Sequence, residues 1–254
     1  MENELRRAVE AEEFMVHYQP IIDLRSEEKY VWGMEALVRW QHPQRGLLYP
    51  QEFVPAAEES GLVVPMGEKV LEKACEHARE WQERYPHIQP WVISVNLSAK
   101  QLERPDLART VEGILRETGL EAGSLSLDIT ETIYVKAREG NTAALDELKK
   151  LGVRFSIDDF GTGYSSLSYL KSLPADALKI DKSFIWVFGE DVEDTVIVQT
   201  IVDLAHTFGM EVIAEGVETE EQAVQLMEMA CDLGQGYYFA RPLPPETMSK
   251  FLDR

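Results

Sequence analysis

The chain alternates short runs of β-branched and aromatic residues with longer segments in which apolar residues recur every three or four positions. Runs of the first kind are typical of buried or half-buried strands. Eight of them occur, at residues 15–24, 30–40, 91–99, 125–131, 154–160, 177–185, 211–217 and 233–240. We predict a strand in each.

The segments between most of these runs have the period of amphipathic helices. One helix is predicted to share a face among Leu71, Ala74, Cys75, Ala78 and Trp81. A second is predicted to begin at Pro105 and to stop at Gly119, with inward-facing Leu107, Val111, Ile114 and Leu115. Two more end ahead of Gly152 and Gly209, with the inward sets Leu145, Leu148 and Leu151, and Ile197, Ile201, Leu204, Ala205 and Phe208. Thr219 and Gln222 predict a capping box for a further helix.

This alternation predicts a mostly parallel sheet with helices on its faces, and eight strands allow closure into a (β/α)8 TIM-like barrel. The first two strands have hairpin-like spacing around residues 25–29, so we expect one antiparallel pair. A doubly wound open sheet is the alternative fold, but no glycine-rich fingerprint follows the first strand. We predict that residues 1–254 form a single barrel domain.

Composition and charge narrow the class of protein. The chain is 44% apolar and 28% charged, as expected of a soluble globular protein. Its net charge of −20 offers no basic footprint for duplex nucleic acid. No apolar run approaches the roughly 20 residues that a membrane segment needs, and the N-terminus does not resemble a signal peptide. We therefore expect a cytoplasmic protein.

The cysteines and histidines do not indicate a metal or redox site. Cys75 and Cys231 are not closely spaced, and Cys75 lies on an apolar helical face, where a buried thiol is expected. The five histidines form no i, i+4 pair, which argues against a zinc site.

Polar residues gather at or near the carboxyl ends of the predicted strands, where barrel enzymes build their active sites. They are Gln19, Glu35, Arg39, Asn96, Asp128, Glu131, Asp158, Asp159, Lys179, Asp181, Glu215, Glu218 and Gln235. Converging carboxylates repel one another unless cations lie between them. Oxygen donors without thiolate or imidazole suit Mg²⁺ or Mn²⁺. Adjacent Asp158 and Asp159 could bridge two such ions. Two metal ions about 3.5–4 Å apart can hold the attacking and the leaving oxygen of a phosphoryl displacement.

Simpler structural roles exist for several of these residues. Glu218 could equally cap the helix that begins beside Thr219, and Lys179 could pair with Asp181. The segment 160–170 contains Gly161 and Gly163, and it could be a plain connector or a mobile loop over the metal site. Asp158 and Asp159 are harder to explain structurally, because neighbouring carboxylates that end an apolar strand need compensation.

The motifs resemble a known family along essentially the whole chain. They are YQPIIDL, GMEALVRWQHP, SVNLSA, DITET, SIDDFGTGYSSL, LKIDKSFI, IAEGVET and CDLGQGYYFARPLP. In this order they resemble the EAL-domain cyclic di-GMP phosphodiesterases, whose name comes from the triplet found here as Glu35, Ala36 and Leu37. The resemblance implies a (β/α)8 barrel with one reversed strand, and hydrolysis of cyclic di-GMP to linear pGpG with Mg²⁺ or Mn²⁺.

The resemblance also implies a role for each site residue. One metal ion would be held by Glu35, Asn96, Asp128 and Asp158, and the second by Asp158, Asp159 and Glu215. Lys179 and Gln235 match positions that orient the attacking water, and Glu131 matches one that anchors the loop after Asp159. The expected substrate contacts are Gln19, Leu37, Arg39 and Glu218, with Arg39 at a phosphate oxygen.

One position departs from the family pattern. Asp128 stands where the family usually has glutamate, so the carboxylate is one methylene shorter, and activity could be lowered or shifted toward Mn²⁺. The resemblance further implies a homodimer, and the opening residues 2–14 are similar to the helix that follows N-terminal sensor or cyclase modules in longer signalling proteins.

Two other functions remain open. The same pocket could bind cyclic di-GMP without cleaving it, as a receptor would. Apart from the resemblance, a one-metal barrel enzyme with Lys179 as base could act on a small carboxylate.

Overall fold

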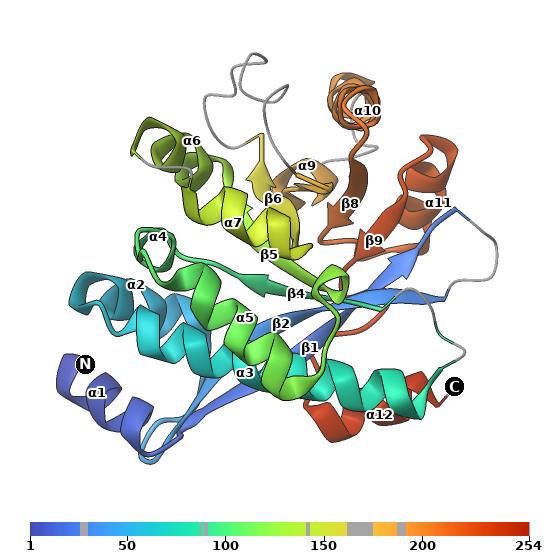
Figure 1. The fold of residues 1–254 in the computed structure, drawn as a ribbon. Helices are drawn as coiled ribbons and strands as arrows, with labels where there is room; N and C mark the ends of the chain where they lie inside the picture. Colours follow the sequence, from blue (N-terminus) through green and yellow to red (C-terminus); the bar gives the residue numbers. More distant parts are fainter. Residues whose placement is uncertain are drawn as a thin grey trace.

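The computed structural model describes residues 1–25, 30–86, 88, 91–140, 143–161, 175–186 and 192–253. Nine strands are present in these residues: β1 Phe14–Asp23, β2 Val31–His42, β3 Gly46–Leu48, β4 Val92–Asn96, β5 Leu125–Thr130, β6 Arg154–Phe160, β7 Ala177–Ile180, β8 Glu211–Glu215 and β9 Leu233–Gln235. They follow the order β1-β9-β8-β7-β6-β5-β4-β2-β3, and pairing of β1 with β2 closes the first eight into a barrel (Figure 1). All eight predicted strands are confirmed.

Strand β1 is the reversed strand. It runs antiparallel to both of its neighbours, β2 and β9, whereas the other neighbouring pairs of the barrel are parallel. This confirms the predicted TIM-like barrel with one antiparallel strand. β3 was not predicted, because three residues are too few to show a period; it pairs with the end of β2, beyond the barrel.

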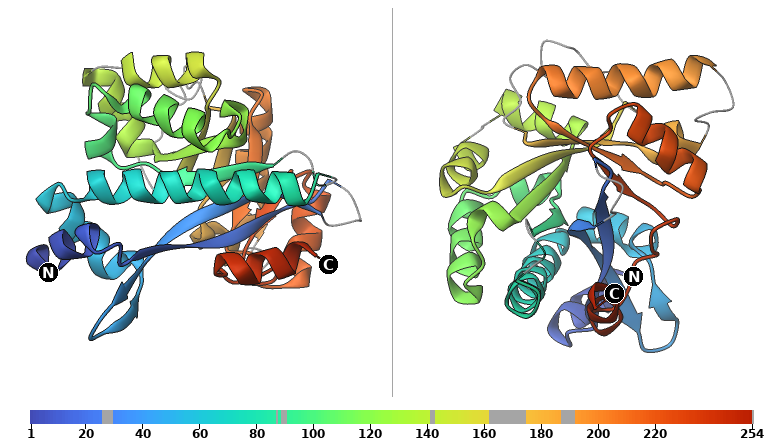
Figure 2. Two further views of the ribbon diagram at one scale, coloured as in Figure 1. Left: turned by 60° about the horizontal axis from the view of Figure 1, so that its bottom comes forward. Right: turned by 90° about the vertical axis from the view of Figure 1, so that its right-hand side faces the viewer.

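The described helices lie around the outside of the barrel (Figure 2). They are α1 Glu2–Glu10, α2 Pro50–Ser60, α3 Val63–Arg84, α4 Ala99–Leu102, α5 Leu107–Thr118, α6 Glu131–Gly140, α7 Ala143–Leu151, α9 Lys182–Trp186, α10 Val192–Thr207, α11 Glu220–Glu228 and α12 Pro245–Leu252, with a 3₁₀ turn at Ala122–Ser124. The capping box of Thr219 and Gln222 is confirmed at the start of α11. The predicted helix ends at Gly119, Gly152 and Gly209 have φ of 71°, 93° and 74°, the left-handed conformation that glycine adopts without strain.

Several predicted boundaries were wrong. The strand predicted over 177–185 stops at Ile180, and α9 begins two residues later; the one predicted over 233–240 stops at Gln235. α5 begins at Leu107 rather than at Pro105. Ile197 does not face inward: it is 41% exposed, while its neighbour Val198 is completely buried. Apolar residues are spread around more than one face of α10, so periodicity alone could not choose between them.

Alternation along the strands separates an apolar layer of the barrel interior from a polar layer. Ala177, Ile213 and Leu233 belong to one buried cluster, together with Ile21, Trp32 and Val92. Each of the first three lies two residues before a polar residue of the same strand, namely Lys179, Glu215 and Gln235. Because side chains two positions apart share a face, the polar residues lie directly above the apolar layer.

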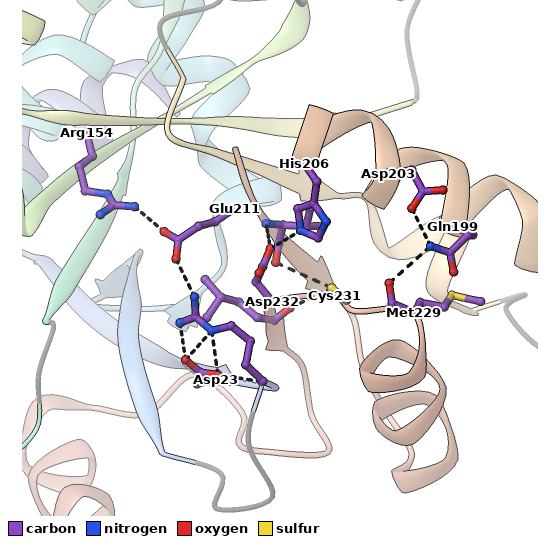
Figure 3. A network of polar contacts seen from close by, with 12 residues as sticks. Asp23, Arg154, Gln199, Asp203, His206, Glu211, Met229, Cys231 and Asp232 are labelled. Atoms are coloured by element: carbon purple, nitrogen blue, oxygen red, sulfur yellow. Dashed lines mark hydrogen bonds and ion pairs between the residues drawn. The ribbon is translucent and has the colours of Figure 1, made fainter. Parts of the chain in front are cut away.

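The opposite rim is joined by ion pairs between strands that are distant in sequence. The guanidinium of Arg25 binds Asp23 in β1 and lies 3.2 Å from Glu211 at the start of β8. The other Glu211 oxygen lies 2.5 Å from Arg154 in β6 (Figure 3). β1 pairs with β9 at only two positions, so these contacts reinforce the seam where the barrel closes.

Candidate active site

Four carboxylates from four different strands surround the ammonium group of Lys179. The Nζ atom lies 2.6 Å from Glu215, 3.1 Å from Asp128, 3.3 Å from Asp158 and 3.6 Å from Glu35. Lys179 is completely buried at the centre of this cluster. The prediction that these side chains converge at one place is confirmed.

Pairing of the strands explains the convergence. Asn96 lies opposite Asp128, and Asp158 lies opposite Thr130, two residues beyond Asp128, so polar residues of β4, β5 and β6 come within two register positions of one another. Glu215 lies opposite Gln235 at the ends of β8 and β9. Parallel strands thus bring residues far apart in sequence to one rim.

The expectation that Gln19 and Glu35 lie at strand ends was wrong. Both lie inside long strands, and they face each other in the β1–β2 register. β2 continues seven residues beyond Glu35, to His42. Because β1 runs the opposite way, this register, rather than a strand end, brings Gln19 to the site.

Gln235 and Asn96 fix the orientation of Glu35. Gln235 Nε2 donates hydrogen bonds to Glu35 Oε2 at 2.6 Å and to Gln19 Oε1 at 3.1 Å. Gln19 Nε2 in turn donates to the backbone oxygen of Ala240 at 3.0 Å. Asn96 Nδ2 donates to the other Glu35 oxygen at 2.7 Å. Both Glu35 oxygens are therefore held in place.

The carboxylates of the site carry more negative charge than Lys179 can balance. Burial raises the pKa of Asp128 to about 6 and that of Glu215 to about 8, in each case against the lowering effect of Lys179. Burial acts to lower the pKa of Lys179, but the surrounding carboxylates outweigh it and leave that pKa well above its usual range. Burial and the neighbouring Asp158 also raise the pKa of Asp159. One ammonium group does not balance all these carboxylates.

The residues present fit a hard divalent cation. Oxygen atoms of Asp158, Asp159 and Glu215 lie within 4.8 Å of one another. Asp159 has a φ of 55°, and its backbone N–H donates to Asp158 Oδ1 at 3.0 Å. Carboxylate oxygens without sulfur or imidazole are the donors that Mg²⁺ and Mn²⁺ prefer. The fold thus builds the acidic cluster that the sequence predicted.

A pocket of about 200 Å³ opens beside this cluster. Six of the predicted site residues line it: Gln19, Glu35, Leu37, Glu215, Glu218 and Gln235. Its walls also include Lys182, Trp186 and Tyr237, which sequence reasoning did not single out. Trp186 directly follows the strand predicted over 177–185, and an aromatic residue near the polar end of a strand could have indicated a pocket wall. The prediction missed it because that strand was drawn too long: β7 stops at Ile180.

Asn96, Arg39 and Glu131 are not among the residues that line this pocket. Leu37 and Asn96 line a neighbouring cavity of about 340 Å³. Arg39 is only 4% exposed, donates to the backbone oxygen of Val38 at 2.8 Å and lies over the ring of Tyr49 at 5.1 Å. Glu131 begins α6. The loop it was expected to anchor, including Gly163, lies largely outside the described residues.

Comparison with known proteins identifies the family. A family model described as EAL domain matches residues 2–242. The chain belongs to the EAL domain family. The predicted family is confirmed, and the triplet of Glu35, Ala36 and Leu37 lies in β2, where Glu35 and Leu37 line the pocket.

Several relatives of this EAL domain are named for an activity on cyclic di-GMP. The bifunctional diguanylate cyclase/cyclic di-GMP phosphodiesterase MucR of Pseudomonas aeruginosa is 43% identical over 246 residues, which are 97% of this chain and 35% of MucR. The cyclic di-GMP phosphodiesterase NbdA of the same species is 42% identical over 255 residues, covering 99% of this chain and 32% of NbdA. The EAL domain thus spans about a third of the length of these curated relatives.

A solved structure shares the fold closely. The MucR phosphodiesterase in complex with c-di-GMP superimposes with a TM-score of 0.90 at 42% identity, covering 97% of this chain and 98% of the other. Among the described residues, no helix has both the length and the apolar character that crossing a bilayer requires.

Proposed function

We propose that this EAL domain is a cyclic di-GMP-specific phosphodiesterase that hydrolyses its substrate to linear pGpG by attack of water, with two Mg²⁺ or Mn²⁺ ions as cofactors. The observation that carries the proposal is the meeting of four strand-borne carboxylates around Lys179 beside a pocket. The cyclic di-GMP phosphodiesterase activity of the relatives MucR and NbdA supports the choice of substrate.

The proposed ligands fall into two sets that share Asp158. Glu35, Asn96, Asp128 and Asp158 would hold one ion, and Asp158, Asp159 and Glu215 the other. The compact oxygen cluster of the second set supports this assignment. When bound, the ions would offset the negative charge of the phosphate and make a water molecule more acidic.

Polar atoms left unsatisfied in the described part of the chain support the roles proposed for its own residues. Gln235 Oε1 is buried and has no hydrogen-bond partner there, so it can accept a hydrogen bond from the attacking water and orient it. Arg39 Nε is likewise buried without a partner and can donate to a phosphate oxygen. Lys179 would hold positive charge next to the water. Gln19, Leu37 and Glu218 line the pocket and would contact the rest of the substrate.

A turnover assay tests the proposal. The chain with Mg²⁺ or Mn²⁺ should convert cyclic di-GMP to pGpG, as followed by chromatography. Asp159→Asn and Glu35→Ala should abolish the conversion, while Glu112→Gln, which removes an exposed carboxylate on α5, should not. Intact cyclic di-GMP after prolonged incubation with either metal would contradict the proposal.

Asp128 favours a second candidate, a receptor that binds cyclic di-GMP without cleaving it. Its short side chain is buried, accepts a hydrogen bond from Ser94 at 2.9 Å and lies 3.1 Å from Lys179, so both oxygens have protein contacts. Because the Asp128 side chain is one methylene shorter than glutamate, its carboxylate could hold a metal ion less tightly. Calorimetry beside the turnover assay separates the two, since a receptor binds tightly and yields no product.

The assembly and location of the protein are further proposals. We propose a homodimer, which the exposed apolar side chains of Val196 and Ile197 on α10 support. N-terminal sensor or cyclase modules are supported by the greater length of MucR and NbdA. We also propose a cytoplasmic location, as expected for a domain that acts on cyclic di-GMP in bacterial signalling. Sedimentation of the chain across concentrations tests the dimer.

A further inference from the structure

Trp186 is the one tryptophan of this chain that is open to solvent. The sequence contains five, and Trp32, Trp40, Trp81 and Trp91 are each at most 4% exposed, whereas Trp186 is 50% exposed. Its indole lines the same pocket as Glu35 and Glu215. An exposed indole beside a carboxylate cluster offers a flat apolar surface in an otherwise polar site.

The indole is held in a defined place. It ends the short helix α9, whose first residue, Lys182, also lines the pocket and places its Nζ 5.2 Å from the centre of the Trp186 ring. Gly216, directly after Glu215, has a φ of 73°. A Cβ atom there would lie 2.5 Å from Lys182 Cβ and 3.3 Å from Trp186 Nε1. The close packing against this glycine therefore fixes Trp186 relative to Glu215.

The same pocket is lined by a second aromatic residue with a cation beside it. Tyr237, next to Gly236, is 51% exposed and has the guanidinium of Arg241 at 4.1 Å from its ring centre. Two aromatic rings with cations beside them thus flank one pocket in a chain of net charge −20. Aromatic faces bind nucleobases, and adjacent cations attract the phosphates that join them. The arrangement suits a nucleotide better than a small carboxylate.

We propose that one guanine ring of cyclic di-GMP stacks on the indole of Trp186 and that this contact positions the scissile phosphodiester at the carboxylate cluster. The inference rests on the proposed function. Trp186 lies just outside the LKIDKSFI motif, so the resemblance assigns it no role. It is therefore a specificity-determining residue beyond the set that the resemblance implies.

Binding in the presence of a chelator tests the contact without turnover. Stacking of one base is worth roughly 1–3 kcal/mol, which corresponds to about 5- to 150-fold in affinity. We expect Trp186→Ala to raise the Kd for cyclic di-GMP by that factor and Trp186→Phe to retain most of the affinity. Because the other four tryptophans are buried, cyclic di-GMP should quench the exposed component of tryptophan fluorescence, and Trp186→Phe should remove the quenching.

Two controls separate stacking from damage to the fold or to the reaction centre. Val224→Ala trims another exposed apolar side chain, on α11, and should leave the Kd unchanged. Hydrolysis of methyl 4-nitrophenyl phosphate, a phosphodiester without a base, should be equal in the unmodified chain and in Trp186→Ala. An unchanged Kd in Trp186→Ala, with cleavage of cyclic di-GMP intact, would overturn only the stacking. Failure of the unmodified chain to bind cyclic di-GMP in chelator, and to cleave it with Mg²⁺ or Mn²⁺, would overturn both the stacking and the proposed function.

Discussion

Gln235 and Glu35 are 200 positions apart in sequence, yet the amide nitrogen of Gln235 lies 2.6 Å from a carboxylate oxygen of Glu35. The contact crosses from β9 to β2 over the reversed strand β1, which lies between them in the barrel. A short, charge-assisted hydrogen bond of this kind fixes a buried carboxylate in one orientation.

Removal of that donor should impair catalysis by the proposed enzyme. Gln235→Ala leaves Glu35 without its amide partner and also removes the free Oε1 acceptor, so we expect kcat/KM for cyclic di-GMP to fall by about 100-fold, as for a misplaced catalytic group. Steady-state kinetics with Mg²⁺ provides the measurement. Gln82→Ala, which removes a hydrogen bond to Ser124 Oγ in another part of the fold, is the matched control and should retain full activity. Equal rates in both variants would contradict the role given to Gln235.

Replacement of Lys179 should make stability depend on metal ions. In Lys179→Met the four surrounding carboxylates lose their buried cation, so we expect a loss of about 3–5 kcal/mol in the free energy of unfolding. Divalent ions should restore part of it, since a ligand that binds only the folded state raises stability with its concentration. Urea unfolding with chelator and with increasing Mn²⁺ measures both effects.

Lys149→Met is the control for the loss of a lysine ion pair. Lys149 pairs with Asp176 at 2.6 Å, but both side chains are about one-third exposed, so the loss should stay within about 1 kcal/mol. If added Mn²⁺ raised the free energy of unfolding of Lys179→Met no more than that of the unmodified chain, the result would argue against a cation site at this cluster.

The ion pairs at the opposite rim should affect stability without affecting the reaction. Glu211→Gln removes the carboxylate shared by Arg25 and Arg154, and its partial exposure limits the expected loss to about 1 kcal/mol. For a chain of this size that loss lowers the melting temperature by about 2–4 °C. Calorimetry together with the turnover assay provides the check. A large fall in turnover with unchanged melting would show that the rim communicates with the site.

His77 should contribute to a loss of stability in mild acid. Burial lowers the pKa of His77, and its Nδ1 lies 2.7 Å from the hydroxyl of Tyr18. The unfolded chain, with a histidine pKa of about 6.5, then binds the proton more readily than the folded chain does. The free energy of unfolding should therefore fall as the pH drops through about 6.5 toward the lower folded value. Urea unfolding from pH 8 to pH 5 should show a smaller decline in His77→Gln, and an equal decline would exclude this histidine as a cause.

Much of the fold and of the acidic cluster could be predicted from the sequence. β-branched runs marked all eight barrel strands, and the polar residues at the ends of β5, β6 and β8 indicated where carboxylates meet. These features are local, because side-chain alternation and the rule that parallel strands share a rim need no knowledge of partners. Asp128, Asp158 and Glu215 were placed correctly for this reason.

The rest was decided by tertiary structure. Gln19 reaches the site only because β1 is reversed and pairs with Glu35 in one register. The exposure of Ile197 and the position of Trp186 depend on which neighbours cover each face of α10 and of the short helix α9. Residue types and periods along the chain thus set the elements and their chemistry, whereas strand direction, register and the packing of separate elements set the distances. Those three arise from contacts between residues far apart in sequence, which no local pattern contains.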